Sequence, residues 1–104
     1  MTILQPTQSC GIGLIFPGQG SQSVGMGKAL AEAYPAIRSV YDEASLVLGY
    51  DIAALCFDGP AEQLNLTEYT QPALLVSSLA ALHALQPLGV APIAVAGHSL
   101  GEYS

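Results

Sequence analysis

The chain has 104 residues, enough for one small domain, and 51% of them are hydrophobic while only 10% are charged. This composition excludes a disordered tail and predicts a chain that is mostly buried. Eight acidic against two basic residues give a formal net charge of −6, and Lys28 and Arg38 are too far apart to form the basic patch that nucleic acid or an anionic membrane requires.

The first ten residues, MTILQPTQSC, contain no Lys or Arg and no long apolar run. They lack the features of a signal peptide or membrane-spanning helix, so the sequence predicts a cytoplasmic protein without a membrane partner. The two cysteines, Cys10 and Cys56, fit reduced thiols better than a disulfide framework. No His, Cys or carboxylate cluster has ligand spacing, so we expect no metal.

An apolar run at residues 11–16, GIGLIF, predicts a buried strand that ends in the glycine-containing loop PGQGSQSVG. Gly18 and Gly20 after a strand are partly typical of a dinucleotide-binding loop, but Ser23 stands where the third glycine would be. Alternatively, a loop at a strand end can direct a backbone N–H, here near Gln19, at a reacting carbonyl.

Two helices are expected next, of which the first is amphipathic. Apolar residues three and four apart predict a helix over 36–48, with Pro35 before it and Gly49 at the position of a left-handed cap. Asp51 is a good N-cap for a shorter second helix, which Gly59 and Pro60 should end.

A third helix is predicted to begin near Thr70-Gln71-Pro72 and to end around Pro87 or Gly89. Its few polar residues point in different directions, which indicates a helix buried inside a larger body. His83 lies within it, and we expect it to be a satisfied core histidine.

A second buried strand is predicted over 93–96, leading directly into Gly97-His98-Ser99-Leu100-Gly101. Strand, helices and strand in this order predict an α/β fold with a partial parallel sheet and flanking helices, normally on both faces. The pattern G-x-S-x-G after a strand is typical of a nucleophile elbow, in which a sharp turn exposes the serine hydroxyl.

Ser99 is therefore the candidate nucleophile, and the backbone N–H of Leu100 can stabilise an oxyanion. A serine hydroxyl needs a general base near neutral pH. His98 is its immediate neighbour, and adjacent side chains on a tight turn diverge, while His83 is expected in the core. The general base is thus missing from the sequence pattern.

The segments LIFPGQGSQSVGMG, TQPALL and GHSLGEYS, in this order and spacing, resemble the malonyl-CoA:acyl-carrier-protein transacylases of fatty acid synthesis and, less closely, polyketide synthase acyltransferase domains. The resemblance covers the chain from Leu14 onward. It implies that Ser99 forms a malonyl-serine ester from malonyl-CoA, which the thiol of acyl carrier protein then cleaves. It also implies an oxyanion hole made by the backbone of Gln19 and Leu100, and no bound cofactor.

The family's catalytic histidine, its carboxylate-binding arginine and its ferredoxin-like small subdomain lie downstream of the elbow. Residues 1–104 are therefore expected to be an incomplete N-terminal part of the α/β-hydrolase-like large subdomain, inactive alone. Two alternatives stay open. One is a serine hydrolase or thioesterase of the α/β-hydrolase type, and the other is a non-enzymatic fragment, whose unpaired sheet edge and apolar surface predict aggregation.

Overall fold

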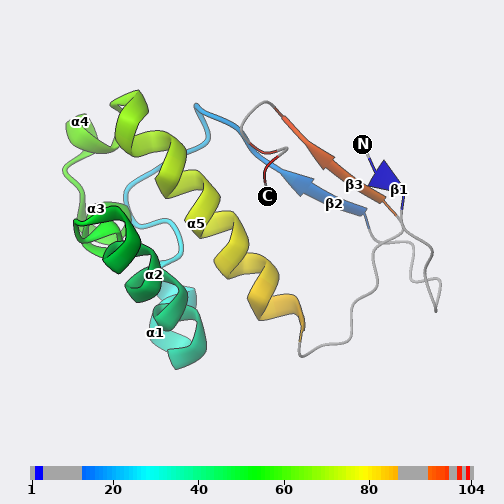
Figure 1. Cartoon of the computed structure of the whole chain (residues 1–104), viewed down its shortest axis with the longest axis horizontal. Coiled ribbons are helices and arrows are strands. Elements are labelled where there is room, and N and C mark those ends of the chain that lie inside the picture. Colours follow the sequence, from blue (N-terminus) through cyan, green and yellow to red (C-terminus); the bar gives the residue numbers. More distant parts are fainter. Residues whose placement is uncertain (1, 4–12, 87–93, 99–100, 102, 104) are drawn as a thin grey trace.

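The computed structural model describes residues 2–3, 13–86, 94–98, 101 and 103, and shows strands on one side of a group of helices (Figure 1). Cys10, Ser99 and Leu100, singled out above, lie outside the described residues, as do the expected helix stop at Pro87 or Gly89 and residues 11, 12 and 93 of the expected strands. In chain order the elements are β1 (Thr2–Ile3), β2 (Gly13–Phe16), α1 (Lys28–Ala33), α2 (Pro35–Leu48), α3 (Ile52–Asp58), α4 (Ala61–Leu64), α5 (Thr67–Leu85) and β3 (Ala94–Gly97).

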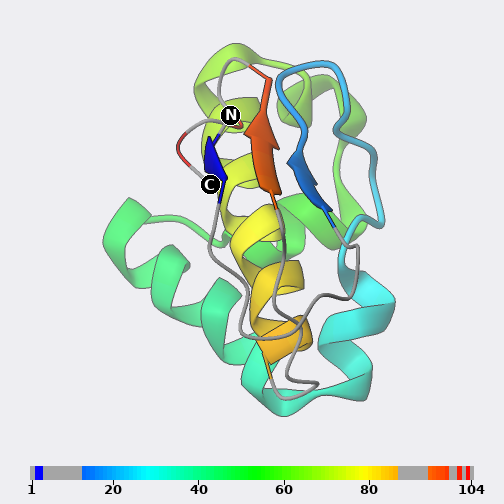
Figure 2. The same cartoon turned by 90° about the vertical axis from the view of Figure 1, so that its right-hand side faces the viewer.

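The strands form a sheet of order β1-β3-β2. β2 and β3 are parallel, as predicted, with Leu14 opposite Val95 and Phe16 opposite Gly97. β1, which the sequence did not predict, adds antiparallel to β3. The described helices lie on one face of this sheet rather than on both (Figures 1 and 2). Ile15 of β2 is accordingly 82% exposed, because alternate residues of a strand point to opposite faces.

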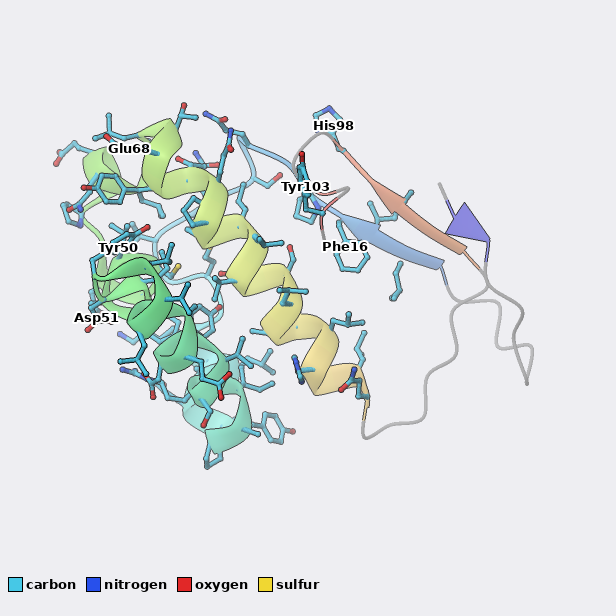
Figure 3. All side chains as sticks on the ribbon, in the orientation of Figure 1. Phe16, Tyr50, Asp51, Glu68, His98 and Tyr103 are labelled. Atoms are coloured by element: carbon cyan, nitrogen blue, oxygen red, sulfur yellow. The ribbon has the colours of Figure 1, made fainter. Side chains whose placement is uncertain are left out.

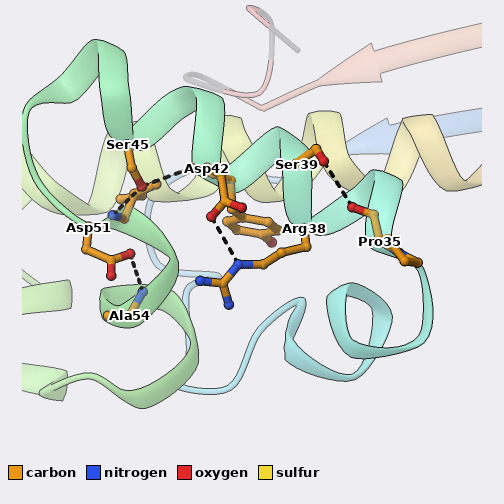
Figure 4. Close-up of polar contacts among 9 residues, drawn as sticks. Pro35, Arg38, Ser39, Asp42, Ser45, Asp51 and Ala54 are labelled. Carbon is orange, nitrogen blue, oxygen red and sulfur yellow. Dashed lines mark hydrogen bonds and ion pairs between the residues drawn. The ribbon is translucent and has the colours of Figure 1, made fainter.

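The predictions for α2 and α3 are confirmed, since both depend on local capping. Pro35 occupies the first turn of α2, and Gly49 ends it in the left-handed conformation, with φ of 83°. Asp51 caps α3, where its Oδ1 accepts a hydrogen bond from the backbone N–H of Ala54 at 3.0 Å (Figure 4). The helix ends at Asp58, directly before Gly59 and Pro60.

α5 begins earlier than expected, at Thr67, and Pro72 lies inside it. The chain already turns before the proline, because the carbonyl of Leu66 accepts from the backbone N–H groups of Tyr69 and Thr70, both at 2.8 Å. The Thr70 hydroxyl donates to the carbonyls of Leu64 and Leu66. This buried threonine thus satisfies carbonyl groups at the start of the helix, two residues before Pro72.

His83 is exposed, so the expectation of a core histidine is wrong. Its position in the last turn of α5 explains this, because the buried residues of the helix end at Ala80.

The main core lies among the helices rather than at the sheet, and a polar chain of contacts crosses it. Tyr41, which is fully buried, donates its hydroxyl to Ser77 Oγ at 3.0 Å, and Ser77 Oγ donates to Cys56 Sγ at 3.9 Å. Burial raises the pKa of the Cys56 thiol to about 11, with the Ser77 hydrogen bond opposing the shift in part. Cys56 is thus a buried free thiol, as expected of a reduced cysteine.

Lys28 and Arg38 each form an ion pair with a nearby carboxylate. Lys28 Nζ lies 3.2 Å from Asp58 Oδ1, and Arg38 Nε lies 3.0 Å from Asp42 Oδ1, one turn along α2 (Figure 4). The prediction that the two would form no basic patch is consistent with this pairing. Within the described residues, no helix is long and apolar enough to cross a membrane.

Candidate active site

The carboxyl ends of β2 and β3 bring the two glycine-containing motifs to one edge of the sheet. Parallel strands end at the same edge, and Phe16 and Gly97, the last residues of the two strands, are register partners. The backbone N–H of His98 extends this pairing, donating to the carbonyl of Phe16 at 3.1 Å. The loop after β2 and the elbow segment after β3 therefore start side by side.

Two glycines allow these segments to touch. A Cβ built on Gly18 would overlap the carbonyl oxygen of His98 and would lie 3.0 Å from its Nδ1. A Cβ on Gly101 would overlap the carbonyl oxygen of Phe16 and would lie 3.0 Å from that of Pro17. Each motif thus needs its glycine so that the other motif can come into contact with it. Sequence patterns treat the two motifs separately and do not report this requirement.

The elbow turns sharply between its described residues. Gly97 closes β3, and the backbone N–H of Gly101 donates to the carbonyl of His98 at 3.0 Å, the i to i+3 bond of a tight turn. Ser99 and Leu100, the candidate nucleophile and oxyanion donor, lie outside the described residues. Of the predicted site residues, the structure therefore brings together Gly18, Gly97 and Gly101.

Gly20 has a different role from Gly18. Its φ is 110°, in the region that favours glycine, and a Cβ there would meet nothing within 4 Å. Glycine at this position allows the backbone conformation of the loop, and is not needed for close contact with another segment. The space beside Gly18 is filled by His98 instead of being open to a pyrophosphate, and the next helix, α1, begins only at Lys28. These features favour the oxyanion-loop explanation over dinucleotide binding.

Side-chain hydrogen bonds that the sequence did not predict hold this loop against the helices. Gln19 Nε2 donates to Thr67 Oγ1 in the first turn of α5, and Gln22 Nε2 donates to Asn65 Oδ1 at the end of α4, both at 2.8 Å. Gln22 Oε1 also accepts from the backbone N–H of Gly20 at 2.8 Å. Turn-forming polar residues between two helices give no sequence signal for such contacts.

Neither described histidine has the surroundings of a general base for the elbow. His98 is exposed and lies just past the end of β3 (Figure 3). His83 belongs to the last turn of α5, and that end of the helix is remote from the carboxyl end of β3 in both views (Figures 1 and 2). In the part of the chain that the structure describes, no three His, Cys, Asp or Glu residues group to hold a metal ion.

A cavity of about 320 Å³ lies between β2 and α5, next to this edge. Its lining includes Phe16, whose ring points from β2 toward α5 (Figure 3), together with Leu74 and Leu82. Among the described residues, no charged or titratable side chain lines it.

Comparison with known proteins identifies the family to which the chain is similar. The family described as acyl transferase domain matches residues 14–104. The chain is 55% identical over 91 residues to malonyl CoA-acyl carrier protein transacylase of Escherichia coli K12, which covers 86% of this chain and 29% of that protein. It therefore spans about three tenths of the length of this curated relative.

Solved structures agree with this likeness. A crystal structure of an acyl carrier protein S-malonyltransferase from Vibrio cholerae matches with a TM-score of 0.84 at 55% identity, covering 88% of this chain and 30% of that one. A malonyl transacylase in complex with a type II polyketide synthase acyl carrier protein matches with a TM-score of 0.84 at 53% identity, over the same shares of the two chains. At 53–55% identity, these structures resemble the chain in sequence as well as in fold.

Proposed function

The chain belongs to the acyl transferase domain family, and from this membership we propose that it supplies the nucleophile and the oxyanion hole of a malonyl-CoA:acyl-carrier-protein transacylase. The observation that carries the proposal is the interlocking of the loop after β2 with the elbow after β3 through Gly18 and Gly101. The malonyl transferases named above are the relatives that support malonyl as the transferred group.

In the proposed reaction, the hydroxyl oxygen of Ser99 attacks the thioester carbonyl of malonyl-CoA. A base takes the hydroxyl proton, and the tetrahedral intermediate collapses with loss of the CoA thiolate, which takes up a proton. The malonyl-serine ester is then attacked by the phosphopantetheine thiol of acyl carrier protein, and Ser99 regains its proton. The solved complex of a related transacylase with a carrier protein supports that second partner.

Gln19 and Leu100 are the proposed oxyanion donors through their backbone N–H groups. Preorganised donors of this kind lower the barrier because they face the charge that develops on the carbonyl oxygen. Within the described residues, the N–H of Gln19 meets no acceptor, while its side chain is held on Thr67. That arrangement supports a backbone role for Gln19.

The base and the group that binds the malonyl carboxylate are proposed to come from parts of the protein outside these 104 residues. Lys28 and Arg38 are poor candidates for the carboxylate, because each already has a carboxylate partner on the helical side of the fold. A bidentate arginine is the residue suited to that role. We assign the chain to the large subdomain, with a ferredoxin-like small subdomain elsewhere in the protein.

Intact-protein mass spectrometry of the full-length protein after brief exposure to malonyl-CoA tests the proposal. We expect one malonyl adduct, absent in Ser99→Ala, that is lost when carrier protein bearing phosphopantetheine is added, with malonyl then found on the carrier. A folded wild-type protein without an adduct would overturn the proposal. Release of free malonate at the same rate with and without carrier protein would instead establish a hydrolase.

A further inference from the structure

The side chains of Asn65 and Thr67 lie against the loop that carries Gln19, although neither belongs to the two motifs of the site. The loop leaves the sheet at Pro17 and passes beside the first turn of α5 in both views (Figures 1 and 2). Thr67 belongs to that turn, and Asn65 is the C-cap of α4. Both residues therefore lie at ends of helices. One of these helices, α5, is itself packed along α2.

The hydrogen bonds form two separate anchors, which we call the Gln19 anchor and the Gln22 anchor. In the first, Gln19 Nε2 donates to Thr67 Oγ1 at 2.8 Å. In the second, Gln22 Nε2 donates to Asn65 Oδ1 while Gln22 Oε1 accepts from the N–H of Gly20, each at 2.8 Å. Gly20 directly follows Gln19, so the second anchor fixes the backbone on the carboxyl side of that residue.

The loop is also fixed on both sides of these anchors. Before Gln19, the backbone of Gly18 is in contact with that of His98. After Gln22, the N–H of Gly25 donates to the carbonyl of Cys56 in α3 at 2.8 Å. The carbonyl of Gly18 also accepts from the backbone N–H of Ser21 at 3.3 Å, which forms a turn around Gln19 and Gly20. The two anchors attach this turn to the helices, so the peptide between Gly18 and Gln19 is held relative to the rest of the fold.

We propose that Asn65 and Thr67 are positioning residues for acyl transfer: through Gln22 and Gln19 they fix the direction of the Gln19 N–H. This inference rests on the proposed function. An oxyanion donor contributes through its orientation before the reaction begins, and small misplacements are costly. The Gln19 anchor holds this side chain on the first turn of α5.

The test uses the full-length protein and two matched pairs of variants. Thr67→Val removes the acceptor oxygen at nearly constant shape, whereas Thr67→Ser keeps it. Asn65→Leu removes the acceptor of Gln22, whereas Asn65→Asp keeps it. Glu68→Gln, an exposed change in the same turn of α5, is the control for a change of surface charge.

We expect Thr67→Val and Asn65→Leu each to slow formation of the malonyl enzyme in single-turnover experiments by about tenfold, with an unchanged KM for malonyl-CoA. Thr67→Ser, Asn65→Asp and Glu68→Gln should keep the wild-type rate. A positioning role predicts this split between rate and KM and the rescue by the conservative variants, which general loss of stability would not give. Gln22→Met breaks the second anchor from the loop side and should slow formation of the malonyl enzyme to the same extent. It replaces Asn65→Leu in the test where that variant folds poorly.

The outcomes separate this inference from the proposed function. A wild-type protein that forms no adduct contradicts the proposed function. If the wild-type protein forms the adduct and Thr67→Val and Asn65→Leu form it at the wild-type rate, the inference is overturned but the proposed function stands. Equal losses in Thr67→Val and Thr67→Ser would also overturn it, because serine retains the acceptor.

Discussion

Gly18 and His98, from loops that follow different strands, lie in backbone contact so close that a Cβ on Gly18 would overlap the carbonyl oxygen of His98. The backbone of Gly18 does not have the positive φ that would itself require glycine. Among the described glycines, that conformation is found at Gly20, Gly25, Gly27, Gly49 and Gly59. The requirement at Gly18 is therefore one of space. It links the loop after β2 to the elbow.

Gly18→Ala should consequently separate the two motifs. The overlap is with backbone, which cannot rotate away, so we expect a loss of about 1–3 kcal/mol in the free energy of unfolding. Formation of the malonyl enzyme should fall together with it. Urea unfolding and adduct formation in the full-length protein measure both, with Ser23→Ala in the same loop as the control. Wild-type behaviour of Gly18→Ala would show that the loop can move away without loss.

Gly27→Ala should be destabilising for two reasons that can be separated. The φ of Gly27 is 79°, and a Cβ there would overlap the hydroxyl of Tyr41. In the Tyr41→Phe background the hydroxyl is gone, so the same change should cost less, leaving about 1 kcal/mol from the strained backbone. A double-mutant cycle by urea unfolding measures the difference. Equal costs in both backgrounds would contradict the proposed overlap.

Asp51→Ala should remove the cap of α3. The carboxylate that accepts from Ala54 N–H is lost, and we expect the free energy of unfolding to fall by about 1 kcal/mol. Asp51→Asn keeps an acceptor oxygen and should remain close to wild type. Unfolding in urea compares the three proteins, and an equal loss in both variants would show that charge, and not capping, is what Asp51 contributes.

Alkaline pH should destabilise the fold through Cys56. Burial raises the pKa of this thiol from 9.0 to about 11, so between these values the unfolded chain releases a proton that the folded chain keeps. The unfolded state then binds fewer protons, and the free energy of unfolding falls as pH rises through this window. Burial raises the pKa of Tyr41 as well, which adds to the fall at higher pH.

Urea unfolding across that pH range, in wild type and Cys56→Ala, isolates the thiol. The variant loses packing at every pH, but its stability should decline less steeply between the two pKa values. Parallel curves for the two proteins would show that the Cys56 thiol titrates alike in the folded and unfolded states.

Features that depend on neighbouring residues were predictable from the sequence. Pro35, Gly49 and Asp51 mark the ends of α2 and α3 because capping uses groups a few positions apart. The parallel pairing of the two apolar strands also followed from their order around the helices. The start of α5 was misplaced because Pro72 is a common first-turn residue, and the stabilising hydroxyl of Thr70 has no pattern of its own.

Features that depend on the packing of distant segments were not predictable. The exposure of His83 depends on which residues of α5 the rest of the fold covers, and periodicity within one helix does not report this. The Gln19 anchor joins residues 48 positions apart through two polar side chains. The glycines of the site were identified from the sequence. The sequence did not show that Gly18 is needed for contact with the elbow, or Gly101 for contact with the loop after β2.

The parallel pairing of β2 with β3 also bears on the order of events during synthesis. It joins Gly13 with Ala94, about eighty residues later, whereas the helices between them form contacts over much shorter stretches of chain. Since pairing over such a separation is slow, we expect the helices to assemble first on a nascent chain. On this order of events, Gln19 contacts α5 before Phe16 and Gly97 come into register. The meeting of the two glycine-containing motifs is then a late step in the folding of this segment.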